Sequence, residues 1–237
     1  MSANPGSLQE RYEAVLDRVS SAALASNRKP EDINVIVVSK NHPAQLVLDL
    51  IDLGAKHFGE NRDQEAAPKA AEVAANSEVE ISWHFVGQLQ SNKAKSVLRY
   101  ASAIHSIDRT SLRQAISKEV QNIRQGQPNF IIDGFIQLNV TDDPNRGGIS
   151  VADLPKFAEE LLADKTINLL GVMGVASLER EAQVDFETIA KASQALQKIH
   201  PSAKFMSAGM SEDFELAIPF GATHLRIGTA ITGKRVY

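Results

Sequence analysis

Short runs of apolar, β-branched residues alternate along the chain with longer segments in which apolar residues recur every three or four positions. Residues 33–38 form a nearly unbroken run, which is typical of a strand buried on both faces of a parallel sheet. Residues 8–25 show helical spacing, and Pro43 is placed like a first-turn proline that starts a helix over residues 44–53. The same analysis predicts strands at residues 33–38, 56–58, 82–86, 103–106, 132–140, 169–174, 203–206 and 223–227.

Helical patterns separate these predicted strands along the whole chain. Eight strand–helix repeats favour an α/β fold closed into a single (β/α)8 TIM barrel, although an open doubly wound sheet has a similar pattern. We predict one domain over residues 1–237, in which residues 1–30 form an N-terminal helical extension. The remaining helices are predicted at residues 63–75, 91–99, 111–124, 152–163, 182–200 and 213–220.

Composition narrows the classes of function. The net charge is -4, so the chain has no overall positive field to hold nucleic acid. It contains no cysteine, which excludes disulfides, thiolate catalysis and zinc held by sulfur. The sequence shows no signal peptide and no apolar run of membrane-spanning length. We therefore expect a soluble, cytoplasmic protein that does not bind membranes. Because no exposed apolar helix calls for a partner, we also expect a monomer.

Polar side chains and glycines gather where the predicted strands end, which is the face of a (β/α)8 barrel that carries its chemistry. Lys40 lies just past the first apolar run. Desolvation at that place favours the uncharged amine, which is a nucleophile toward carbonyl groups. The alternative is a lysine whose charged head simply reaches solvent beyond the strand.

Two segments that combine glycine with hydroxyl side chains follow the last two strands, where barrels of this class usually bind phosphate. They are residues 207–211 and Gly228–Thr229. Glycine lets backbone N–H groups approach phosphate oxygens, while Ser207 and Thr229 can add hydroxyl donors. Taken alone, each segment could equally be a turn.

Four other polar residues lie near the same rim. Arg226 precedes the last predicted loop and can face the pocket, although a surface ion pair is the alternative. Glu60 is as readily explained by an ion pair that supports the rim. His84 and His105 lack metal-ligand spacing, so we expect structural, hydrogen-bonding histidines and no metal site.

Several of these residues belong to longer motifs that occur in one order along nearly the whole chain. The motifs are VVSK at 37–40, FGEN at 58–61, WHFVGQLQSNK at 83–93, SAGMS at 207–211 and RIGTA at 226–230. In them the chain resembles the pyridoxal phosphate homeostasis proteins, also called proline synthetase co-transcribed homologues. The resemblance implies the fold of the alanine racemase N-terminal barrel, the type III fold of enzymes that use pyridoxal 5′-phosphate (PLP).

The resemblance also implies a PLP site. Lys40 would carry the cofactor as a Schiff base. A guanidinium that faces the pyridine nitrogen can only donate, so it would leave that nitrogen unprotonated and make the ring a weak electron sink. The other implied contacts are the cofactor phosphate with Ser207, Gly228 and Thr229, the pyridine nitrogen with Arg226, and the ring with Asn61.

These features predict a PLP carrier that takes part in intracellular PLP (vitamin B6) and amino-acid homeostasis without strong catalysis. The chain ends at Tyr237 after the eighth repeat, so we expect no C-terminal β-domain to supply a second catalytic base. Expected partners are PLP, other B6 vitamers and PLP-dependent apoenzymes.

Three alternatives remain open at this point. The first is a minimal PLP-dependent amino-acid racemase with Lys40 as its base. The second is a class I aldolase in which Lys40 attacks a sugar-phosphate carbonyl directly. The third is a nucleic-acid-binding or scaffold protein, which the acidic balance of the chain disfavours.

Overall fold

The computed structural model describes residues 6–141, 143 and 146–233. The predicted domain 1–237 extends beyond this part at both ends, and Tyr237 lies outside the described residues. Within the described ranges, no helix combines the length and the apolar character needed to cross a membrane.

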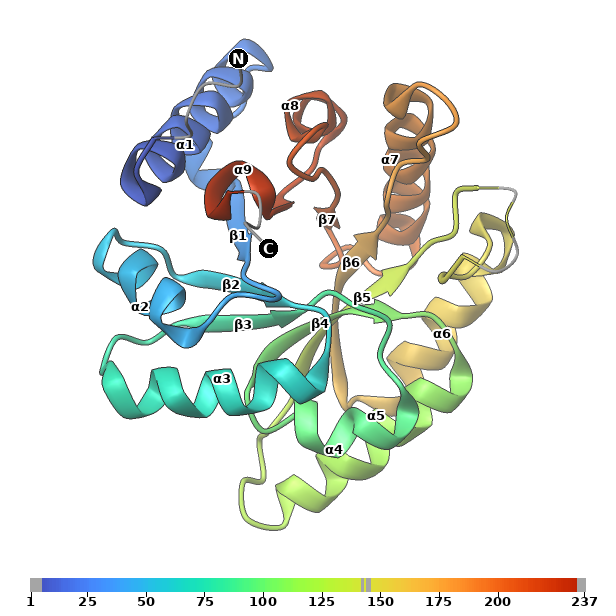
Figure 1. The fold of residues 1–237 in the computed structure, drawn as a ribbon. Helices are drawn as coiled ribbons and strands as arrows, with labels where there is room; N and C mark the ends of the chain where they lie inside the picture. The colour runs from blue at the N-terminus through green and yellow to red at the C-terminus, as the bar shows by residue number, and fades with distance from the viewer. Residues whose placement is uncertain (1–5, 142, 144–145, 234–237) are drawn as a thin grey trace.

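Eight parallel strands form a closed barrel in chain order, with each strand beside the next (Figure 1). The barrel closes because residues 34–37 of the first strand pair in register with residues 224–227 of the last. This arrangement confirms the predicted (β/α)8 class and excludes the open sheet. The strands are β1 (Asn34–Val38), β2 (His57–Glu60), β3 (Ser82–Phe85), β4 (Ala101–Ile107), β5 (Ile132–Gln137), β6 (Ile167–Met173), β7 (Phe205–Ser207) and β8 (His224–Ile227).

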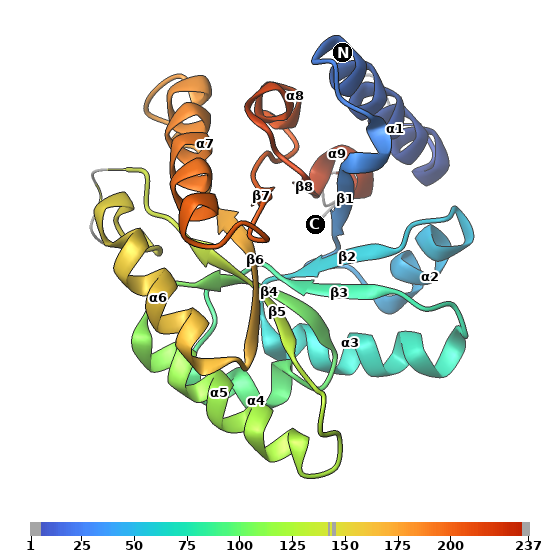
Figure 2. The same cartoon turned by 180° about the vertical axis from the view of Figure 1, so that it is seen from behind.

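Helices surround the strands, as the views from both sides show (Figures 1 and 2). The buried apolar residues of the helices belong to one core cluster together with residues of the strands, as is usual for a parallel sheet covered by helices. The α-helices are α1 (Leu8–Ala25), α2 (Ala44–Asp52), α3 (Asp63–Asn76), α4 (Ala94–Val97), α5 (Thr110–Arg124), α6 (Leu154–Asp164), α7 (Ala182–Ile199), α8 (Phe214–Ala217) and α9 (Thr229–Thr232). The short 3-10 helices are η1 (Pro30–Asp32), η2 (Ser91–Lys93), η3 (Val151–Asp153) and η4 (Ile218–Phe220).

The predicted elements differ from the observed ones mainly where regular structure is short. The helix predicted over residues 91–99 divides into η2 and the single turn α4. The helix predicted over 213–220 divides into α8 and η4 because Pro219, near the start of η4, lacks the N–H that a continued α-helix needs. The segment α9 has no helical period and was not predicted as a helix.

Two further differences concern where elements begin and end. Pro43 precedes α2 instead of lying in its first turn, since its ψ of 165° is extended. The strand predicted over residues 132–140 ends at Gln137, and the following Leu138 makes only an isolated bridge to Ile149. The chain leaves the sheet there to form the rim after β5.

Helix α1 packs against α8, η4 and α9, the last helices of the chain that the structure describes. A capping box between Ser7 and Glu10 begins it. Arg18 donates two hydrogen bonds to the Glu215 carboxylate beyond β7, and the guanidinium of Arg28 donates to two backbone carbonyls near η4. These contacts attach α1 to the barrel, while the division of the domain near residue 30 stays a prediction.

Rings and small residues fill the inside of the barrel. The Phe135 ring lies 4.3 Å from the His105 ring and 5.1 Å from the His224 ring, measured between centroids. A Cβ atom placed on Gly59 would lie only 3.0 Å from Ile36 and 3.3 Å from Val38. These side chains face inward from five strands, so the interior is a packed core below the mouth of the barrel.

The closest backbone approach in this core predicts a stability effect. A Cβ atom on Gly171 of β6 would lie 1.7 Å from the carbonyl oxygen of Phe205 in β7. We expect Gly171→Ala to lower the free energy of unfolding by about 2–3 kcal/mol, because β6 and β7 must separate to admit the methyl group. Gly126→Ala is the matched control, since its Cβ would have no atom nearer than 4.0 Å. Urea unfolding measures both, and equal stabilities would contradict the packing described.

Candidate functional site

Lys40 lies in the turn that follows β1, at the mouth of the barrel. It lines a cavity of about 150 Å³ together with Gly228 and Thr229 from the end of β8. Its side chain is exposed, so the desolvation expected from the sequence is wrong. The reason is local: the buried position at the strand end goes to Ser39, and Asn41, with a φ of 64°, turns the chain. The structure brings the lysine and the glycine–threonine segment together.

A buried ion pair holds the residue that precedes Lys40. Glu60 Oε1 accepts hydrogen bonds from Ser39 Oγ at 2.8 Å and from Lys69 Nζ at 2.5 Å. Lys69 also donates to the carbonyl oxygen of Ser39 at 2.8 Å. The expected ion pair of Glu60 therefore exists, and it ties β1 and β2 to α3. The sequence analysis did not predict Lys69 as the partner. The only hint in the sequence is that this lysine occupies a position among small, apolar residues of the predicted helix.

Asn61 directly follows β2, and β2 pairs with β1, the strand that precedes Lys40. Both residues lie two positions beyond the paired residues Val38 and Gly59, so they are neighbours at the rim. Asn61 Oδ1 is buried and has no hydrogen-bond partner among the described residues. Gly87 packs against the backbone of Asn61, because a Cβ atom on Gly87 would be 2.2 Å from the Asn61 carbonyl oxygen. A buried acceptor without a partner is costly, so Asn61 Oδ1 is a candidate to accept a hydrogen bond from a bound ligand.

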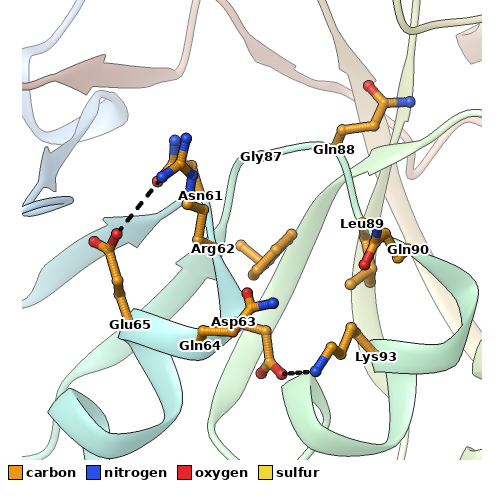
Figure 3. A pocket seen from close by; sticks show the side chains of 11 residues that line it. Asn61, Arg62, Asp63, Gln64, Glu65, Gly87, Gln88, Leu89, Gln90 and Lys93 are labelled. Carbon is orange, nitrogen blue, oxygen red and sulfur yellow. Dashed lines mark ion pairs between the residues drawn. The ribbon is translucent and has the colours of Figure 1, made fainter.

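A larger cavity of about 690 Å³ opens beside Asn61, between the segments that follow β2 and β3 (Figure 3). Two long ion pairs cross its wall, Arg62 with Glu65 and Lys93 with Asp63, each at 3.9 Å. Asn61 thus lines a different cavity from Lys40 and Thr229. The structure places these predicted residues at one rim but not in one pocket.

Backbone amides converge on a hydroxyl group beyond β7. Ser211 Oγ accepts hydrogen bonds from the N–H groups of Gly228 at 3.2 Å and Ala230 at 3.3 Å. Gly209 makes this turn possible with a φ of 91°. Two N–H donors and a hydroxyl group form a donor set suited to an anionic oxygen. Ser211 was quoted in a sequence motif but was not predicted as a site residue.

Ser207 has another environment. It is fully buried, and its Oγ accepts a hydrogen bond from Arg226 Nη1 at 2.6 Å and lies 2.8 Å from His105 Nδ1. Its side chain therefore points into the barrel, and its role as a phosphate ligand stays a prediction. The physical reason is that Ser207 belongs to the strand β7, whereas Ser211 follows the turn at Gly209.

Arg226 is buried inside the barrel, so the alternative of a surface ion pair is wrong. Besides its bond to Ser207, it donates from Nη2 to the carbonyl oxygen of Gly174 at 2.8 Å. Burial lowers the pKa of Arg226 to about 10, and Asp213 opposes this shift. The guanidinium is still positively charged at neutral pH, and it can only donate hydrogen bonds.

The histidines behave as expected from the sequence. His84 and His105 hydrogen-bond to each other inside the barrel, and burial lowers the pKa of both well below the usual range. They are therefore neutral, structural residues. Among the described residues, no group of three or more histidine, aspartate or glutamate side chains could hold a metal ion.

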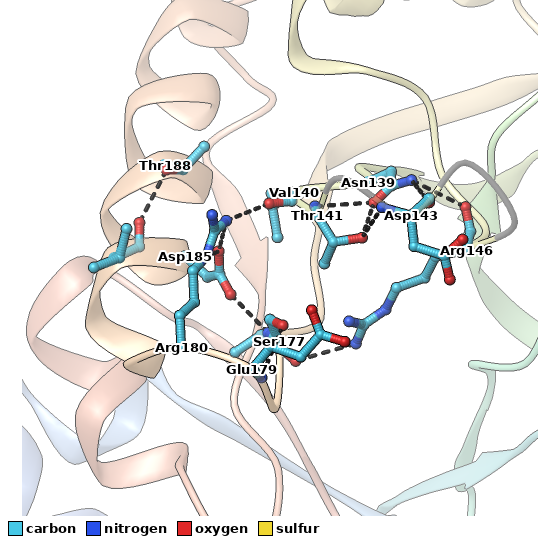
Figure 4. A network of polar contacts seen from close by, with 12 residues as sticks. Asn139, Val140, Thr141, Asp143, Arg146, Ser177, Glu179, Arg180, Asp185 and Thr188 are labelled. Atoms are coloured by element: carbon cyan, nitrogen blue, oxygen red, sulfur yellow. Dashed lines mark hydrogen bonds and ion pairs between the residues drawn. The ribbon is translucent and has the colours of Figure 1, made fainter.

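A polar network fixes the opposite side of the mouth, where loops follow β5 and β6 (Figure 4). Arg180 binds the buried carboxylate of Asp185 and donates to the carbonyl oxygen of Val140 at 2.5 Å. Arg146 Nη2 donates to the carbonyl oxygen of Ala176 at 3.1 Å. The network links the two loops to α7, so this part of the rim is held by hydrogen bonds between elements.

Comparisons with known proteins agree with this fold. Residues 20–236 match the family model of the alanine racemase N-terminal domain. The chain is 36% identical over 226 residues to a pyridoxal phosphate homeostasis protein of Escherichia coli strain K12, covering 94% of each chain. It resembles the structure of PipY of Synechococcus elongatus with PLP bound, with a TM-score of 0.78, 32% identity and coverage of 92% of this chain and 100% of that one. The crystal structure of an unknown protein from Bifidobacterium adolescentis has a TM-score of 0.86 at 26% identity, covering 94% of both chains.

The ion pair beneath Lys40 predicts a double-mutant effect. We expect Lys69→Met to lower the free energy of unfolding by about 3–5 kcal/mol, because it leaves the Glu60 carboxylate buried without a cation. The double variant Glu60→Met with Lys69→Met should regain most of that loss, since no uncompensated charge remains. Urea unfolding of the two single variants and the double variant measures this coupling. Losses that simply add in the double variant would show that the pair is not coupled.

Proposed function

Because this chain belongs to the pyridoxal phosphate homeostasis proteins, within the alanine racemase N-terminal domain family, we propose that it binds PLP at the mouth of its barrel through Lys40. The observation that carries the proposal is the cavity that Lys40 shares with Gly228 and Thr229. An amine and a set of phosphate-type donors thus lie together, as a ligand with an aldehyde and a phosphate requires. The PLP bound to the related PipY structure supports the same ligand.

The chemistry of the donors fits this cofactor. When bound, PLP supplies an aldehyde with which the amine of Lys40 condenses reversibly. The N–H groups of Gly228 and Ala230, now directed at the Ser211 hydroxyl, are suited to hold phosphate oxygens together with the hydroxyl of Thr229. Asn61 lines the neighbouring cavity, and its buried Oδ1, which has no hydrogen-bond partner among the described residues, is the atom that we assign to the ring.

We assign Arg226 and Ser207, the remaining two predicted residues, to one hydrogen-bonded pair. Arg226 is the donor that would face the ring nitrogen, and Ser207 holds the guanidinium from within the barrel. Since its pKa of about 10 keeps Arg226 charged, it cannot accept a proton from the ring nitrogen or give that nitrogen a full positive charge at neutral pH. This supports a cofactor that is held but only weakly activated.

A carrier role in PLP (vitamin B6) and amino-acid homeostasis follows from this weak activation. Racemisation also needs an acid–base group on the far side of the substrate from Lys40. Tyrosine could serve, but Tyr12 is buried in α1 and Tyr100 lies near Asp63, so neither described tyrosine faces the Lys40 cavity. We propose PLP, other B6 vitamers and PLP-dependent apoenzymes as binding partners. We also propose that the protein acts in the cytoplasm as a monomer.

The attachment to Lys40 is tested by chemical trapping. Incubation with PLP followed by borohydride should add one pyridoxyl group to Lys40, found by mass spectrometry of peptides. Lys40→Ala should abolish the product, whereas Lys118→Ala, which removes an exposed lysine of α5, should leave it unchanged. Equal labelling of Lys40→Ala and the wild-type protein would contradict the proposal. A chain that binds no PLP but is labelled by a sugar phosphate under borohydride would instead support the aldolase alternative.

The absence of strong catalysis is tested by exchange of the α-proton. We expect the PLP-loaded protein to exchange the α-proton of L-alanine in D2O faster than free PLP by less than the roughly 100-fold at which a well-placed acid–base group typically begins to contribute, because the cofactor ring is only weakly activated. NMR spectroscopy follows the loss of the proton signal. Sustained turnover that disappears in Lys40→Ala would contradict this expectation and favour the racemase.

A further inference from the structure

A continuous chain of hydrogen bonds crosses the interior of the barrel from the start of β2 to β8. His57 Nδ1 lies 3.0 Å from His84 Nε2, and His84 Nδ1 lies 2.9 Å from His105 Nε2. His105 Nδ1 lies 2.8 Å from Ser207 Oγ, which accepts from Arg226 Nη1 at 2.6 Å. Five side chains, one from each of the strands β2, β3, β4, β7 and β8, are thus linked.

The middle of this chain is closed to solvent. His84 is 5% exposed, and His105 and Ser207 are 0% exposed. Burial lowers the pKa of His57 and lowers that of His84 and His105 well below the usual range, so the three imidazoles are neutral at neutral pH. A neutral imidazole has one donor nitrogen and one acceptor nitrogen. Two facing histidines therefore bond only when one donates and the other accepts, and the direction of each link determines the next.

Arg226 sets that direction. Its guanidinium can only donate, so the Ser207 oxygen accepts at this link. Among the described residues, the other partner of the Ser207 hydroxyl is His105 Nδ1, which must accept the O–H if that donor is to be satisfied. His105 then carries its proton on Nε2 and donates to His84, which in turn donates from Nε2 to His57. His57 is half-buried, so its own Nε2–H can reach solvent.

We propose that His57, His84 and His105 form a histidine ladder, all in the Nε2–H tautomer, that positions Arg226 through the Ser207 hydroxyl. With the O–H turned toward His105, the lone pairs of Ser207 are left to accept from the guanidinium. The ladder is complete without a cofactor. Only its effect on ligand affinity rests on the proposed function, because Arg226 is the residue assigned to the ring nitrogen.

The charged and titratable groups around the ladder all favour its neutral form. Lys56 precedes His57 and disfavours a second positive charge there. His224 faces His84 and His105 from β8, with ring centroids 6.2 and 6.1 Å away. It stands outside the ladder, because its two nitrogens contact the side chains of Asn34, at the start of β1, and Thr223, just before β8. Burial lowers the pKa of His224 to about 4.

The tautomers are tested in the wild-type protein without PLP. Two-bond ¹H–¹⁵N correlation spectra of protein labelled at the imidazole nitrogens distinguish the two neutral tautomers and the charged ring. We expect His84 and His105 to show protonated Nε2 and unprotonated Nδ1 at neutral pH. Signals of either residue from the Nδ1–H tautomer or from the charged imidazolium would overturn the ladder. Because no cofactor is present, this outcome is independent of whether the chain binds PLP.

A matched pair of substitutions tests whether the ladder acts on Arg226. His57→Asn keeps an acceptor near the position of Nδ1, whereas His57→Leu removes it and leaves the His84 donor without a partner. We expect His57→Leu to move His84 and His105 toward the Nδ1–H tautomer and to weaken PLP binding roughly fivefold, the effect of about one neutral hydrogen bond. His57→Asn should keep wild-type tautomers and affinity. Shifted tautomers with unchanged affinity would overturn the positioning role, and unchanged tautomers in His57→Leu would overturn the coupling along the ladder.

Discussion

The buried charge of Arg226 is the constraint on which the interior of this barrel depends. A guanidinium inside a protein must be satisfied by acceptors, because its desolvation is otherwise too costly. Here the Ser207 hydroxyl and the carbonyl oxygen of Gly174 supply them. The inward direction of Ser207 and the line of bonded histidines behind it follow from that requirement. Polar groups therefore occupy the centre of a barrel that apolar side chains usually fill.

The mouth of the barrel is organised by a second buried charge pair. Glu60 and Lys69 lie beneath the end of β1 and fix the backbone of Ser39. Lys40 follows as an exposed residue next to the loop after β8. One buried pair thus holds the backbone while the neighbouring amine is accessible. This division of roles suits a protein that must take up and release a ligand at an open rim.

The sequence predicted the barrel well because its strands are apolar runs and most of its helices have clear periodicity. It failed where tertiary contacts decide. The partner of Glu60 lies in the next helix, and nothing in the local pattern identifies Lys69 as the cation. Ser207 and Ser211 belong to one motif, and the local pattern does not reveal that Ser207 faces the barrel interior while Ser211 contacts the amides of Gly228 and Ala230. The exposure of Lys40 depends on a turn at Asn41 that the apolar run before it does not reveal.

We propose that the amine of Lys40 and the backbone amides of Gly228 and Ala230 bind the two ends of the same small molecule. A crystal structure of the chain with PLP tests it most directly. We predict electron density continuous from Lys40 Nζ to the cofactor, with the phosphate against the N–H groups of Gly228 and Ala230. PLP in the larger cavity beside Arg62 and Lys93, with Lys40 unmodified, would contradict it.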